Sequence, residues 1–123
     1  MDPKYPIFVF EKDDRSLRMI ESLKSIRYHL EAIDIENDEY VFWDRDGRGV
    51  RVITSGRKIA DLSSCEATLP WSDGFSQFLS SNELPKSIMK ESPMETWEGI
   101  QGALSARPKK AGFWSRLFAS KWR

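Results

Sequence analysis

An Asp-Gly turn between two apolar runs constrains the fold of this chain more than any other sequence feature. The runs are residues 40–43 and 50–53, and the polar residues 44–49, which include Asp46 and Gly47, join them. Aspartate and glycine tolerate the positive φ angles that tight hairpin turns need, so the pattern predicts an antiparallel β-hairpin. Residues 57–62 are compatible with one further short strand.

A second hairpin is predicted at the N-terminus. Residues 5–12 are rich in β-branched and aromatic side chains, which favour a strand, and Leu17 and Met19 alternate with polar neighbours as in a returning strand. A helical spacing of apolar residues overlaps that returning strand: Met19, Leu23, Ile26, Leu30 and Ile33. We favour the hairpin, followed by a helix over residues 23–32 with Ser22 as its N-cap.

Later segments predict helices. Ser72 is a candidate N-cap for a helix that ends near residues 82–85, and Ser92 and Glu95 around Pro93 have the form of a capping box. Together these elements predict an α+β fold, in which two β-hairpins form a small antiparallel sheet with helices packed on one face.

The net charge of zero hides a separation of charge along the chain. Residues 107–123 hold six basic residues and no acid, which leaves 13 basic against 19 acidic residues in the preceding part. This asymmetry predicts a single acidic α+β domain over residues 1–106 and a basic amphipathic C-terminal tail over residues 107–123.

The residue inventory disfavours most enzyme classes. The single histidine, His29, has no histidine partner for a metal pair, and we expect it on or near a helix surface. The single cysteine, Cys65, has no basic neighbour to activate it, and we expect a packed, unreactive thiol. We therefore predict no catalytic residue, no metal site, no cofactor and no enzymatic activity. With no apolar span of membrane length and no secretory signal, we expect a cytoplasmic protein.

One segment carries a resemblance. Residues 28–40 read YHLEAIDIENDEY, and Trp43, Asp44 and the Asp-Gly turn follow. This stretch resembles a helix-to-strand segment, "YLE-x-ID-[IV]-EN", of small uncharacterised bacterial proteins. In size and layout the chain is also similar to immunity-type proteins of bacterial toxin systems. The resemblance implies no catalytic motif.

An acidic stretch is the first candidate binding feature. Charge runs most often simply face water. The functional alternative is a docking surface for a basic protein, in which complementary charge speeds association and an aromatic anchor supplies affinity. The candidate partner-binding residues are Glu31, Asp34, Glu36, Asp38, Glu39, Trp43, Asp44 and Asp46. Nucleic acid is disfavoured as a partner because the acidic domain would repel phosphates.

The tail is the second candidate feature. Its apolar residues share one face of a predicted short helix: Phe113, Trp114, Leu117, Phe118 and Trp122. That helix is suited to its own domain, to a protein partner or to an anionic membrane surface. The sequence therefore favours a non-enzymatic binding protein of immunity or adaptor type, with a peripheral inner-membrane protein as the alternative.

Overall fold

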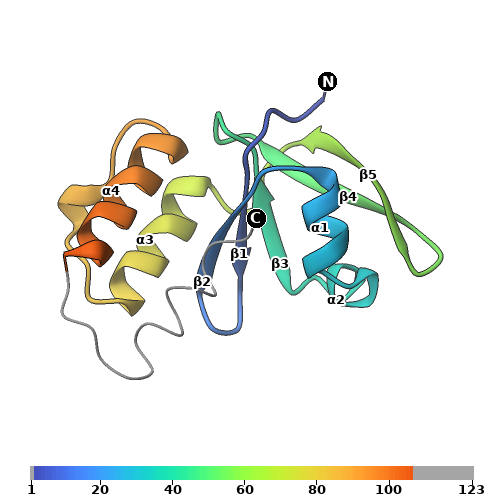
Figure 1. Ribbon diagram of the computed structural model, residues 1–123, viewed down its shortest axis with the longest axis horizontal. Coiled ribbons are helices and arrows are strands. Elements are labelled where there is room, and N and C mark those ends of the chain that lie inside the picture. Colours follow the sequence, from blue (N-terminus) through green and yellow to red (C-terminus); the bar gives the residue numbers. More distant parts are fainter. Residues whose placement is uncertain (1, 107–123) are drawn as a thin grey trace.

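The computed structural model describes residues 2–106 and shows an α+β fold (Figure 1). The strands, in chain order, are β1 Ile7–Glu11, β2 Ser16–Ile20, β3 Tyr40–Trp43, β4 Gly49–Ser55 and β5 Lys58–Cys65. The helices are α1 Leu23–His29, α2 Ala32–Glu36, α3 Trp71–Ser81 and α4 Pro93–Ser105, with a 3-10 turn, η1, at Lys86–Ile88. The fold class predicted from the sequence is confirmed.

One antiparallel sheet contains all five strands, in the order β2-β1-β3-β4-β5. Both predicted hairpins are present: β1 pairs with β2, and β3 pairs with β4 across the Asp-Gly turn, where Gly47 has a φ of 88°. The first hairpin joins the second because β1 also pairs with β3. The suggested last strand is longer than predicted and forms the edge of the sheet opposite β2.

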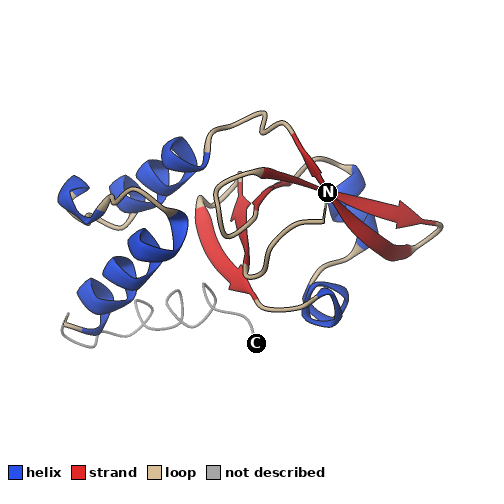
Figure 2. Cartoon of the chain, turned by 90° about the horizontal axis from the view of Figure 1, so that it is seen from above, coloured by secondary structure: helices blue, strands red, loops and turns tan. Residues whose placement is uncertain are grey.

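Helices cover both faces of the sheet, so the molecule has three layers (Figures 1 and 2). Successive residues of β1 point to opposite faces, as the pleat of a strand requires. Phe8 and Phe10 pack in the cluster that α3 and α4 complete, whereas Ile7 and Val9 pack in the cluster beneath α1 and α2. The later helices therefore share one face as expected, but the early helical segment occupies the other face.

Two of the three predicted helix starts are confirmed. The Ser22 side chain accepts a hydrogen bond from the Ser25 amide, and the Ser92 side chain accepts one from the Glu95 amide. The Ser72 prediction is wrong, because α3 begins at Trp71 with Pro70 as its N-cap.

The first helix is also shorter than predicted. Residue Leu30 is extended and buried, so α1 ends at His29 and the chain turns before α2 begins at Ala32. This break creates a corner between two short helices, which we call the α1–α2 corner, residues 28–36.

Candidate binding surface

Five of the predicted acids gather around α2 and the turn that leads into β3. We call Glu31, Asp34, Glu36, Asp38 and Glu39 the acidic face. Glu31, Glu36 and Asp38 are exposed, and Asp34 and Glu39 are half-buried. Asp38 adopts the left-handed conformation, with a φ of 58°, that ends this segment before the strand. The local fold therefore brings these five side chains to one region of the surface.

Trp43 was predicted as an aromatic anchor, and that prediction is wrong. The indole is fully buried between the sheet and α3, where Gly74 lies against its ring. Its Nε1 donates a hydrogen bond of 2.7 Å to the carbonyl of Leu69, which satisfies the polar atom. A buried, hydrogen-bonded indole in the core cannot contact a partner.

Asp44 was predicted as a docking acid, and that prediction is also wrong. Its side chain is fully buried and organises the β3–β4 turn. One carboxylate oxygen accepts hydrogen bonds from the amides of Asp46 and Arg48, at 2.9 and 3.0 Å, and the other accepts one from the amide of Lys4, at 3.3 Å. The carboxylate thus accepts hydrogen bonds from backbone amides that have no carbonyl partner within the turn.

Asp46 is exposed, but it is separated from the acidic face. Strand β3 runs between Glu39 and the β3–β4 turn, and four strand residues span about 13 Å. Asp46 forms exposed ion pairs with Lys4 and Arg48, at 3.6 and 3.2 Å. The β3–β4 turn, which contains Asp46, lies at the opposite end of the sheet from α2 (Figure 1).

Like charges crowd one end of the acidic face. Loss of hydration raises the pKa of the Glu39 carboxyl, as do the nearby carboxylates of Asp34, Asp13 and Glu11 and a hydrogen bond with Asp34. Asp38 is partly compensated by Lys12, whose ammonium lies 2.9 Å from its carboxylate. The acids of β1 and the β1–β2 turn therefore extend the negative potential of the acidic face.

Carboxylates of the same region also act on the phenol of Tyr40, which is half-buried. Burial, followed by the charges of Glu11 and Asp34, raises the pKa of Tyr40 to about 12, against the opposing effect of Arg18. Burial is the largest cause, because it removes water that would solvate a phenolate, and the neighbouring carboxylates add to the shift.

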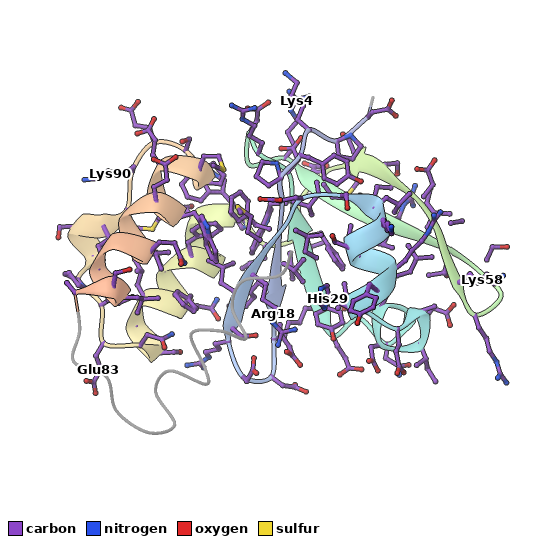
Figure 3. All side chains as sticks on the ribbon, in the orientation of Figure 1. Lys4, Arg18, His29, Lys58, Glu83 and Lys90 are labelled. Atoms are coloured by element: carbon purple, nitrogen blue, oxygen red, sulfur yellow. The ribbon has the colours of Figure 1, made fainter. Side chains whose placement is uncertain are left out.

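A groove with a volume of about 1070 Å³ lies between α2 and the tip of the β4–β5 hairpin. The α2 side contributes Leu30, Ile33, Glu31 and Glu36, and hairpin residues 55–60 form the other side. The helix side is apolar and acidic, whereas the hairpin side carries two basic residues, one of which, Lys58, stands at the hairpin tip in Figure 3.

Two hydrogen-bonded contacts hold the walls of the groove. The Arg27 guanidinium donates to the carbonyls of Ile59 and Ala60, at 2.9 and 3.0 Å, and so ties α1 to the edge strand β5. The hydroxyl of Thr54 donates to the carboxylate of Glu36 at 2.9 Å and ties α2 to β4. Hydrogen bonds thus link the elements that bound the groove, α1 to β5 and α2 to β4.

The exposed apolar side chains of the α1–α2 corner were not predicted from the sequence. Tyr28 is 83% exposed and Ile33 is 59% exposed, the two highest values among the large exposed hydrophobic residues of the described part. Ile33 fits the helical spacing that predicted a core position. The break after α1 changes the direction of the chain and turns Ile33 outward.

The titratable residues considered for chemistry lie apart. His29 is exposed on α1, as expected (Figure 3). Its ring packs edge-on against that of Tyr28, with 4.9 Å between the ring centroids. Cys65 is exposed, contrary to the predicted packed thiol, because it ends the edge strand β5. Within residues 2–106, no three His, Cys, Asp or Glu side chains are grouped as metal ligands.

The predicted tail residues Phe113, Trp114, Leu117, Phe118 and Trp122 lie outside the described residues. In the part that the structure does describe, no helix combines the length and hydrophobicity needed to cross a membrane. No family model, curated protein or solved structure matches this chain.

Proposed function

We propose that this chain is a non-enzymatic protein-binding module, of immunity or adaptor type, whose acidic face binds a basic protein. The observation that carries the proposal is the coincidence of the acidic face with the exposed side chains of Tyr28 and Ile33. A solvated charge run needs no exposed apolar residues beside it, whereas a docking surface combines steering charges with apolar contact area.

The charge of the domain supports the same proposal. Residues 2–106 hold 19 acidic and 13 basic residues, which gives a net charge of −6. Part of this charge is concentrated where Asp34 and Glu39 repel each other. A basic partner would relieve this repulsion on binding, and complementary charge would raise the association rate at low ionic strength.

The test is capture of partners from the native cell with four forms of the full chain. Wild type is compared with Glu31→Lys, Ile33→Ser and Glu98→Lys. Glu98 is an exposed acid on α4, so its reversal changes net charge by the same amount at a distant site.

A partner of this surface is retained by wild type and Glu98→Lys and is lost from the two variants of the α1–α2 corner. The affinity of the purified pair should fall as salt rises. A partner that all four forms retain equally, or a pair insensitive to salt, would contradict the proposal. If the captured protein is toxic, coexpression with this chain should restore growth, which tests the immunity type.

A further inference from the structure

The exposed apolar side chains of the α1–α2 corner lack a cover within the described structure. Tyr28 and Ile33 lie on either side of the helix break, and Ile33 also lines the groove beside α2. The corner and the turn after it are strongly acidic: residues 28–39 contain five acidic residues and no lysine or arginine. A segment that fits here must be apolar on one side and basic on the other.

The chain itself supplies such a segment in residues 113–123. Its sequence places Trp114, Leu117 and Phe118 on one side of a helical pattern, and it holds three basic residues and no acid. Residues 107–112 add three more cations. The tail therefore carries +6 against the −6 of the described domain, and both its charge and its hydrophobic pattern complement the corner.

The length of the chain after α4 makes this docking feasible. The helix α4 ends at Ser105 and lies on the face of the sheet opposite α1 and α2, so the segment must pass around an edge of the sheet to reach the corner (Figures 1 and 2). Six linker residues span at most about 20 Å, and an eleven-residue helix adds about 16 Å. A domain of this size has a radius of gyration of about 13 Å, which corresponds to a diameter of about 33 Å, whereas the 17 residues of 107–123 span about 56 Å when extended, so the chain is long enough to pass the sheet edge.

We propose that residues 113–123 of this chain dock on its own α1–α2 corner. The apolar side of the segment covers Tyr28 and Ile33, and its cations face Glu31, Asp34 and Glu36. The linker passes the β1–β2 turn, where Asp13 and Asp14 complement its basic residues. This docking goes beyond the binding function proposed above and uses the same surface, so a partner of the acidic face would have to displace the segment.

The experiment places a spin label on the tail of the full chain. The variant Cys65→Ser removes the native thiol, and Ser120→Cys provides a labelling site off the apolar side of the segment. The expected result is a selective loss of amide NMR intensity at residues 28–38 in the paramagnetic sample relative to its reduced form. The amides of α4 residues 95–101 should keep their intensity.

Two matched variants test the contact. Ile33→Ser should restore the lost amide intensities, whereas Ile53→Ser should not. Ile53 is also exposed, but its neighbour Val52 packs in the cluster beneath α1 and α2, so Ile53 points to the opposite face of the sheet. Raising the salt concentration should weaken the effect.

Three outcomes would overturn the proposal. The first is a loss of intensity centred on other elements, or none. The second is a loss seen equally when labelled and isotope-enriched chains are different molecules, which would indicate a second copy. The third is an unaffected corner in a chain that binds anionic vesicles through Trp114 and Trp122, which would assign the tail to a membrane surface.

Discussion

Replacing Asp44 by alanine should destabilise the protein more than any other single change in its surface turns. The carboxylate is fully buried and accepts three backbone hydrogen bonds, from the amides of Asp46, Arg48 and Lys4. Leaving three partly buried donors without an acceptor costs about 1 kcal/mol each, or about 3 kcal/mol in total. For a domain of this size, that loss lowers the melting temperature by roughly 12–24 °C.

The assay is urea and thermal unfolding of wild type, Asp44→Ala, Asp44→Asn and Asp46→Ala. Asp46 lies in the same turn, but its ion pairs with Lys4 and Arg48 are exposed, so its removal should cost less than about 1 kcal/mol. Asp44→Asn should fall between the two, because the amide keeps one accepting oxygen but presents its NH2 to the Lys4 amide. Equal losses in Asp44→Ala and Asp46→Ala would refute the structural role of the buried carboxylate.

Three further predictions concern the core, the sheet edge and a phenol. Gly74→Ala should cost about 1–3 kcal/mol in unfolding experiments, because its Cβ would overlap the Trp43 indole, whereas Gly102→Ala faces open space on α4 and should stabilise by up to about 1 kcal/mol. Arg27→Gln should speed amide hydrogen exchange along β5 but not along the central strand β1, since it removes the guanidinium that binds two β5 carbonyls; unchanged β5 exchange would contradict this. The pKa of Tyr40 is raised from 10.0 to about 12, so the unfolded chain loses the phenol proton at a lower pH than the folded chain. The contribution of Tyr40 to the free energy of unfolding is therefore complete below pH 10 and is lost as the pH rises through 12. In Tyr40→Phe, the stability measured over that pH range should therefore fall less steeply than in wild type.

Local signals in the sequence were sufficient for the hairpins and for two helix starts. The Asp-Gly turn needs only the positive φ that Gly47 adopts, and strand alternation at Leu17 and Met19 outweighed the competing helical spacing. Ser22 and Ser92 cap their helices through hydrogen bonds to amides three residues away. Contacts over so short a range are encoded by neighbouring residues, so the sequence predicts them.

The clustering of Glu31, Asp34, Glu36, Asp38 and Glu39 also followed from the sequence, because one short segment carries all five. Which of the eight candidate partner-binding residues are buried and which are exposed could not be predicted from the sequence. Trp43 belongs to the core because α3, some thirty residues later, brings Gly74 against its ring. Asp44 is buried because the N-terminal segment supplies the Lys4 amide.

The α1–α2 corner depended on tertiary structure for the same reason. The spacing of Leu23, Ile26, Leu30 and Ile33 suits one continuous helix, and nothing local separates the last residue from the others. Packing of Leu30 against the sheet in an extended conformation ends α1 and turns Ile33 into solvent. The burial of one leucine by distant strands outweighs the helical preference of its neighbours, and this long-range competition is what a local pattern cannot express.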